Sequence, residues 1–181
     1  MEKIEKDVVI IGAGVAGLAA SMFLAQRGIS FVLIDKKSSP DEFKTHCGYS
    51  WGEFTKYGIS QEVWKEKWER FIIHLPGVDI EVLLPDFARK SAGYVDRKKL
   101  FQEMYERAEN KGTFIFGEEA QKLEFDEVGN VEAVYSAGHR LKGRVFIDCS
   151  GASRFLSQKL IGDSLKRKAV GIEKIYQKRS R

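Results

Sequence analysis

The stretch "DVVIIGAGVAGLAAS", residues 7–21, decides the fold of this chain. It opens with a short β-branched apolar run, residues 8–11, and continues with apolar residues at helical spacing over residues 14–27. A second apolar run, residues 31–34, follows and ends at Asp35. Two buried strands joined by a helix of this length predict a βαβ unit, which requires a parallel sheet and a right-handed crossover.

Three glycines, Gly12, Gly14 and Gly17, stand between the first strand and the helix in the order GxGxxG. The first allows a tight turn, the second lets the backbone approach a pyrophosphate, and the third brings the helix close to the strand. Asp35, at the end of the second strand, is placed to accept hydrogen bonds from ribose hydroxyls. These features predict a dinucleotide site. Asp35 would repel a 2′-phosphate, so NADP is disfavoured, while the motif alone leaves FAD and NAD open.

The composition is that of an ordinary globular protein. The chain has 181 residues, enough for one domain with a good core, and 31% of them are charged. The net charge of +4 is local, because eight Lys and Arg against two acids from residue 159 onward give that tail +6. We interpret the tail as a solvated end and expect no nucleic-acid partner. The sequence shows neither a membrane-spanning apolar run nor a signal peptide, so the expected compartment is the cytoplasm.

The cysteines and histidines do not form a metal-binding pattern. The two cysteines, Cys47 and Cys149, are far apart in sequence, and the three histidines stand at unrelated spacings. Neither arrangement matches a zinc site, so we expect no metal. A disulfide between the two cysteines is disfavoured in a reducing cytosol.

The rest of the sequence predicts a mixture of loops, strands and helices. Residues 38–58 are typical of a long loop. Residues 60–71 predict a helix capped by Ser60, with an aromatic stripe that belongs to the core rather than to a cofactor site. Residues 72–75 and 80–84 predict a hairpin. The other expected elements are a helix that ends at Gly112 and strands at residues 114–116, 120–125, 131–135 and 144–149.

Five segments occur in the order and at about the spacing of a known family: "DVVIIGAGVAGLAAS", "VLIDK", "HCG", "YVDRKKLF" and "VFIDCSGASRFL". On these segments the chain resembles the N-terminal part of the FAD-dependent geranylgeranyl reductases, which belong to the p-hydroxybenzoate-hydroxylase-like flavoproteins. The resemblance implies an α/β fold: a Rossmann-like FAD-binding domain with a parallel sheet, a β-hairpin or meander and part of a substrate-domain sheet. It implies an FAD-binding core of residues 1–58 and 94–165. Residues 59–93 and 166–181 would be part of a substrate domain, with the C-terminal half of the family fold missing.

The resemblance also implies which residues meet FAD. Cys47 and Gly48 would lie near the isoalloxazine ring. Arg97 would lie near the ribityl chain and pyrophosphate, and Ala120 would contact the adenine through its backbone. Ser150 stands where many relatives have Asp, which leaves its role open. The full set of expected cofactor-binding residues is Gly12, Gly14, Ala16, Gly17, Asp35, Lys36, Cys47, Gly48, Arg97 and Ala120.

The implied activity is hydride transfer from the reduced flavin to a carbon–carbon double bond of a prenyl lipid, followed by proton transfer. Cys47, or a water near it, is the expected proton donor, and Tyr49 is a weaker candidate. The alternative is that Cys47 only packs within its loop. A protonated His46 would lower the pKa of the Cys47 thiol, but adjacent residues of an extended segment point apart.

Two other functions are kept as alternatives. The first is a flavin-dependent aromatic monooxygenase, which shares the fold. The second is a non-catalytic FAD-binding module that needs a second chain carrying the missing half. The sequence leaves open whether NAD(P)H or ferredoxin is the electron donor, and a prenyl-lipid substrate implies peripheral contact with a membrane.

Overall fold

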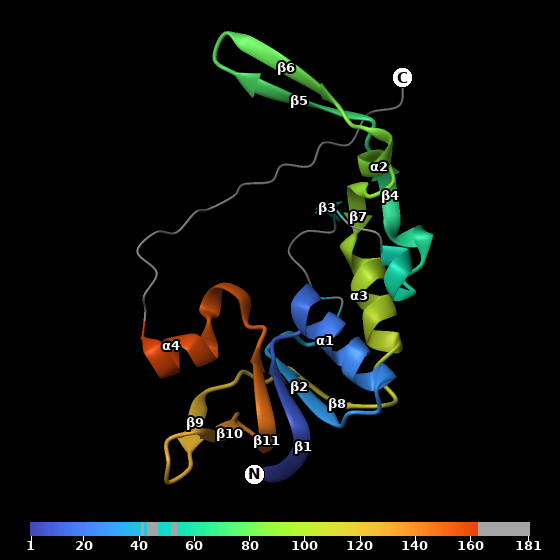
Figure 1. Cartoon of the computed structure of the whole chain (residues 1–181). Helices are drawn as coiled ribbons and strands as arrows, with labels where there is room; N and C mark the ends of the chain where they lie inside the picture. Colours follow the sequence, from blue (N-terminus) through green and yellow to red (C-terminus); the bar gives the residue numbers. More distant parts are fainter. Residues whose placement is uncertain (41, 43–46, 52–53, 163–181) are drawn as a thin grey trace.

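The computed structural model describes residues 1–40, 42, 47–51 and 54–162. Its central sheet consists of β1 (Glu2–Ile11), β2 (Phe31–Asp35), β8 (Thr113–Phe116), β9 (Lys122–Phe125), β10 (Val131–Tyr135) and β11 (His139–Asp148). The strand order is β8-β2-β1-β11-β10-β9 (Figure 1). β8, β2, β1 and β11 run parallel to one another, and β10 and β9 extend the sheet as an antiparallel meander. The expected α/β fold with a parallel-rich sheet is confirmed.

The other elements of the described chain surround this sheet or extend from it. The helices are α1 (Val15–Gln26), α2 (Asp86–Arg89), α3 (Arg97–Glu106) and α4 (Phe155–Ile161), and the 3-10 turns are η1 (Phe54–Tyr57), η2 (Gln61–Val63) and η3 (Gly151–Ser153). A small sheet contains β3 (Cys47–Trp51), β7 (Ala92–Asp96) and β4 (Trp64–Lys67), while β5 (Arg70–Leu75) and β6 (Val78–Leu83) form a hairpin. Among the residues that the structure describes, no helix is long and apolar enough to cross a membrane.

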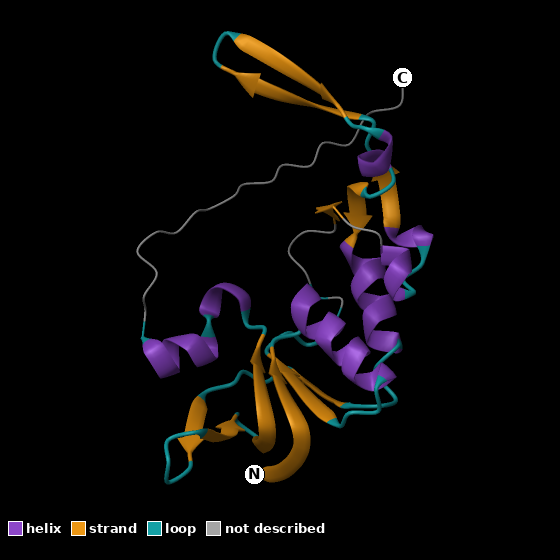
Figure 2. Cartoon of the chain, viewed as in Figure 1, coloured by secondary structure: helices purple, strands orange, loops and turns teal. Residues whose placement is uncertain are grey.

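The C-terminal part of β1, residues 8–11, is buried on both faces of the sheet. Val8 and Ile10 pack with α1 and α3 on one face, where these two helices lie side by side (Figure 2). Val9 and Ile11 pack on the other face with the meander and with Leu156 of α4. A strand that is covered on both faces requires a continuous apolar run instead of alternation, and this is the pattern that predicted it.

The predicted helix is present as α3, but it ends at Glu106 instead of at Gly112. The side chain of Asp96 caps its first turn by accepting a hydrogen bond from Lys99 N at 3.2 Å. Its inward face buries Leu100 and Met104 against α1. The predicted hairpin is also present, since β5 pairs with β6 in antiparallel register and extends away from the central sheet (Figure 1).

The helix predicted over residues 60–71 is wrong. Ser60 does cap, but it caps the short turn η2, where its side chain accepts from Glu62 N at 3.1 Å. From Trp64 onward the chain forms β4 and β5, and β4 pairs with β7 so that Trp64 lies opposite Val95. Pairing with a strand about 30 residues later overrides the local helical spacing. The aromatic side chains still join apolar clusters of the core, as expected.

The loop predicted over residues 38–58 is also partly wrong. Within it, the described residues 47–51 form β3, which pairs antiparallel with β7. Residues 54–57 form η1. Both β3 and β4 therefore depend on β7, which a local pattern cannot reveal.

Two of the three motif glycines, Gly12 in the turn and Gly17 in the first turn of α1, stand where a side chain does not fit. Gly12 has a φ of +105°, and a Cβ there would overlap the carbonyl oxygen of Cys149. A Cβ on Gly17 would overlap the carbonyl oxygen of Gly12. At Gly14, by contrast, a Cβ would meet no atom within 4 Å. The first and third glycines are thus required for the turn and for the approach of α1 to β1.

Two carboxylates hold the meander together. Glu124 on β9 accepts hydrogen bonds from Arg140 Nε at 2.8 Å and from the Tyr135 hydroxyl at 2.6 Å. Glu118 accepts from the Ser136 hydroxyl at 2.6 Å and from Gly138 N at 3.0 Å. These hydrogen bonds favour the ionised form and lower the pKa of each carboxyl group from 4.5 to about 2.

Gly17→Ala should destabilise the fold because its methyl group has to push the helix away from the backbone of the turn. We expect the free energy of unfolding, measured by urea denaturation, to fall by about 2 kcal/mol or more. Gly14→Ala is the matched control and should change it by less than about 0.5 kcal/mol. Equal losses in the two variants would contradict the proposed steric roles.

The lowered pKa values of Glu118 and Glu124 predict that the folded protein loses stability in acid. Because the folded pKa of each lies below the unfolded value, their contribution is present above pH 4.5 and is lost as the pH falls toward 2. The double variant Glu118→Gln/Glu124→Gln should therefore be less stable than the wild type at neutral pH, and the gap should close over this acid range. A gap in unfolding free energy that is independent of pH would refute this assignment.

Candidate functional site

A pocket of about 420 Å³ opens at the carboxyl ends of β1 and β2. In open α/β sheets, ligands bind at this edge of the sheet. Four segments line the pocket: the glycine turn, the end of β2, the β8–β9 connection and the segment that carries η3 and α4. The lining residues are Ile11, Gly12, Ile34, Asp35, Lys36, Glu119, Ala120, Ser150, Ala152, Ser153, Phe155, Gln158 and Lys159.

Hydrogen bonds to both neighbouring strands hold the glycine turn. Gly12 N donates to Ile34 O on β2, and Cys149 N after β11 donates to Ile11 O, both at 2.8 Å. α1 then begins after Gly14, which caps the helix without a side-chain hydrogen bond. Its first turn contains no acidic residue. The first N–H groups of a helix have no partner within the helix, so this end of α1 is suited to an anion.

Asp35 joins the end of β2 to the glycine turn. Its carboxylate accepts hydrogen bonds from Ala13 N and, at 2.8 Å, from Lys37 N. The ammonium group of Lys37 donates to Ala13 O at 2.8 Å. At the rim of the pocket, Lys36 forms an ion pair with Glu119 at 3.1 Å, in which both side chains are more than 60% exposed. Such an exposed pair contributes little to stability, but it links the two segments that flank the pocket.

Asp148 holds the wall that η3 and α4 form. Its carboxylate accepts from Leu156 N at 2.9 Å and from Ser157 N at 3.3 Å, at the start of α4. It also accepts from the backbone and hydroxyl of Ser150. Burial acts to raise the pKa of Asp148, but these hydrogen bonds outweigh it, and the pKa lies below its ordinary value. The ionised carboxylate therefore fixes Ser150 and α4 beside the pocket.

Cys149 lies next to this wall and is partly buried. Burial raises the pKa of its thiol, and the neighbouring charge of Asp148 raises it further. The thiol is therefore protonated at neutral pH, and the cysteine is free. We assign Cys149 a packing role beside the glycine turn.

The structure brings only part of the predicted site into the pocket. Gly12, Asp35, Lys36 and Ala120 line it, as does Ser150. The others lie outside the pocket lining. Near the start of α1 are Gly14, Ala16 and Gly17, in β3 of the small sheet are Cys47, Gly48 and Tyr49, and at the start of α3 is Arg97.

The expected flavin-side residues meet along the small sheet. The backbone of Cys47 lies opposite Asp96, and Tyr49 lies opposite Tyr94. Arg97 follows Asp96 as the first residue of α3. The sheet thus brings the chain at Cys47 next to the chain at Arg97. The side chains of residues 47–51, and His46 as a whole, lie outside what the structure describes, so their roles stay predictions.

Sequence reasoning missed the part of the pocket that α4 and the β8–β9 connection supply. Glu119, Phe155, Gln158 and Lys159 line the pocket but were not predicted. The available signal was the segment "VFIDCSGASRFL", in which Asp148 ends a strand and a serine-rich turn leads into an apolar pair. This pattern is typical of a helix start, and it follows a strand of the same parallel sheet.

Comparison with known proteins identifies the family. The family described as lycopene cyclase protein matches residues 7–176. Monooxygenase 1 of Arabidopsis thaliana is 26% identical over 168 residues, which are 86% of this chain and 41% of that protein. Capsanthin/capsorubin synthase of Capsicum annuum is 26% identical over 157 residues, which are 86% of this chain and 30% of that protein.

Solved structures share the fold. PqsL, a probable FAD-dependent monooxygenase from Pseudomonas aeruginosa, has a TM-score of 0.73 at 14% identity, over 92% of this chain and 48% of that one. A geranylgeranyl bacteriochlorophyll reductase-like protein from Thermoplasma acidophilum has a TM-score of 0.65 at 18% identity, over 81% of this chain and 39% of that one.

The chain spans less than half the length of each of these four proteins. The predicted flavoprotein fold is confirmed by the two structures. The family that matches, however, is not described as a geranylgeranyl reductase family, and the matched proteins from Arabidopsis and Capsicum are not named as reductases. Because the match extends over most of the sequence, the chain belongs to the lycopene cyclase protein family.

Proposed function

We propose that this chain is the FAD-binding part of an oxidoreductase that acts on an unsaturated isoprenoid. The observation that carries the proposal is the pocket at the carboxyl edge of the sheet, which is lined by Gly12 of the glycine turn and by Asp35. The turn leads directly into α1, whose N-cap residue Gly14 makes no side-chain hydrogen bond to the first N–H groups. Relatives and structural neighbours include FAD-dependent monooxygenases, which supports FAD rather than NAD as the dinucleotide.

The residues at this edge fit the cofactor. A methyl group at Gly14 would occupy open space at the start of α1, which is where a pyrophosphate would contact the backbone. An ionised carboxylate has about four acceptor positions, so Asp35 has capacity for ribose hydroxyls beyond its two backbone partners. Ala120 would meet the adenine. When bound, FAD supplies the two-electron chemistry, and the protein supplies orientation and exclusion of water.

We assign each of the remaining expected residues to one part of FAD. Gly17 and Ala16 would lie at the helix start beside the pyrophosphate, Lys36 near the adenosine, and Arg97 near the ribityl chain. Cys47 and Gly48 would border the isoalloxazine ring. We keep residues 1–58 and 94–165 as the FAD-binding core, and residues 59–93 and 166–181 as part of the substrate-binding region.

The substrate class rests on what the similar proteins share. The description of the family names lycopene, which is a long polyene isoprenoid. The name of the structural neighbour from Thermoplasma contains a geranylgeranyl group. Both molecules are apolar chains with carbon–carbon double bonds. The proposed reaction adds a hydride to one carbon of such a bond and a proton to its neighbour. An isolated alkene accepts hydride poorly, so a positioned proton donor is needed, and Cys47 is the first candidate and Tyr49 the second.

An aromatic monooxygenase is the second candidate function. Monooxygenase 1 and the PqsL structure favour it as directly as the family description favours an isoprenoid. A third candidate is a non-catalytic FAD module that needs a partner chain.

For the isoprenoid oxidoreductase, we expect a cytoplasmic protein that contacts the membrane peripherally to reach a prenyl lipid. We expect either NAD(P)H or ferredoxin as the electron donor.

One experiment separates these candidates. The chain is expressed alone and together with the reading frame that follows it, and each preparation is inspected for bound flavin. Flavin-loaded protein, reduced without oxygen, is mixed with a geranylgeranyl lipid, and a product with two added hydrogen atoms per bond supports the reductase. Oxygen-dependent NAD(P)H consumption with a phenol, and no alkene reduction, would instead favour the monooxygenase.

Gly14→Ala should weaken FAD binding without loss of stability. The added methyl group has free space in the protein but lies where the pyrophosphate would approach, so we expect about tenfold or weaker affinity by isothermal titration calorimetry. Unchanged affinity would place the pyrophosphate elsewhere.

Cys47→Ala should leave FAD binding nearly intact and slow alkene reduction, because the substitution removes the proposed proton donor. The measurement is single-turnover reoxidation of the reduced flavin by the prenyl substrate. Equal turnover in both proteins would remove Cys47 from the mechanism.

A further inference from the structure

The β8–β9 connection, residues 117–121, forms one wall of the pocket without being a helix or strand itself. Its backbone is fastened near both ends. Gly117 N donates to Lys37 O at 2.7 Å, and Gln121 N donates to Tyr135 O at 2.8 Å. Between these two points lie Glu119 and Ala120, the residues that face the pocket.

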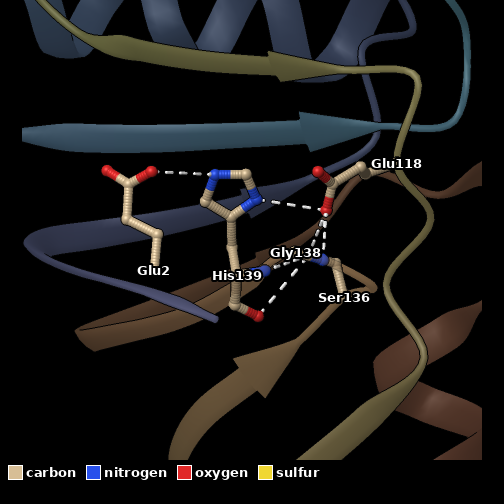
Figure 3. A network of polar contacts seen from close by, with 5 residues as sticks. All are labelled: Glu2, Glu118, Ser136, Gly138 and His139. Atoms are coloured by element: carbon tan, nitrogen blue, oxygen red, sulfur yellow. Dashed lines mark hydrogen bonds and ion pairs between the residues drawn. The ribbon is translucent and has the colours of Figure 1, made fainter.

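The carboxylate of Glu118 fastens the middle of this connection to the turn between β10 and β11 (Figure 3). A single oxygen, Oε2, lies 2.6 Å from the Ser136 hydroxyl, 3.0 Å from Gly138 N and 3.1 Å from His139 Nδ1. The other ring nitrogen of His139 lies 3.5 Å from the carboxylate of Glu2 on β1. Ser136 is buried, with 3% of its surface exposed.

Glu118 is therefore fastened on two sides. Its backbone N donates to Asp35 O at 3.2 Å, and Asp35 itself lines the pocket. Its side chain is held by a tight turn of the meander. The next two residues along the chain, Glu119 and Ala120, cannot leave the pocket wall without breaking one of these attachments.

We propose that Glu118 is a positioning residue of the nucleotide pocket. It holds Glu119 and Ala120 in place beside the end of β2 before a ligand arrives, and so strengthens binding of the adenosine part of FAD. This inference rests on the proposed function, since it assumes that the pocket takes an adenine nucleotide. The physical basis is preorganisation, because a wall that is already ordered has less conformational entropy to lose on binding.

The chain provides a matched control in Glu124. This carboxylate belongs to the same meander and accepts two side-chain hydrogen bonds, from Tyr135 and Arg140, but it does not line the pocket. Glu118→Gln and Glu124→Gln should both lower the thermal midpoint of unfolding. Only Glu118→Gln should also loosen the pocket wall.

The test is titration calorimetry of each protein with ADP, which carries the adenosine and the two phosphates without the flavin. We expect Glu118→Gln to bind ADP about tenfold more weakly than the wild type, and Glu124→Gln to bind it as the wild type does. Amide hydrogen exchange provides a second readout in the absence of ligand. The amides of Glu119 and Ala120 should exchange faster in Glu118→Gln and at the wild-type rate in Glu124→Gln.

A milder variant covers the case in which Glu118→Gln does not fold. Ser136→Ala removes one partner of the carboxylate and should weaken ADP binding in the same direction but less. Wild-type affinity and wild-type exchange in the folded Glu118 or Ser136 variant would overturn the inference, as would equal weakening in the Glu124 control. If the wild type binds neither ADP nor FAD, the proposed function itself fails.

Discussion

The close approach of α1 to the turn that precedes it is the contact on which the rest of this structure depends. Gly17 lies so near the carbonyl oxygen of Gly12 that no side chain fits between them, and Gly12 lies equally near the backbone after β11. This contact sets where α1 begins and directs its first N–H groups over the carboxyl ends of the parallel strands. The position of the pocket floor and of the helix end that is suited to an anion follows from it.

The pocket walls are held by carboxylates that accept hydrogen bonds from backbone N–H groups. Asp35 accepts two backbone N–H groups, Asp148 accepts the first N–H groups of α4, and Glu118 accepts from the turn of the meander. Hydrogen bonds to a charged acceptor are stronger than those between neutral groups. Asp35 and Glu118 also join segments that are distant in sequence, whereas the partners of Asp148 lie within nine residues of it. Hydrogen bonds within the chain therefore hold the segments that line the pocket.

The central sheet and the hairpin β5–β6 differ in how completely their apolar side chains are buried. The central sheet is covered on both faces, whereas the hairpin β5–β6 exposes apolar side chains along both strands, with Leu83 67% exposed. A two-stranded hairpin has little independent stability in water. Within the described chain, the apolar side chains of the hairpin are thus much less covered than those of the central sheet.

Elements whose signals are local could be predicted from the sequence. The apolar run and GxGxxG specified β1, the turn and α1, because turn sterics and helix spacing involve neighbouring residues. Asp35 could be predicted because the end of the second strand in a βαβ unit lies beside the glycine turn. The apolar spacing of α3 and the two apolar runs of the hairpin are local patterns as well. That residues 64–67 form a strand follows from long-range pairing, since their partner β7 lies about 30 residues later. The same holds for the pocket walls at Glu119 and Gln158, which reach the glycine turn through sheet topology and long-range hydrogen bonds that leave no periodic trace in the sequence.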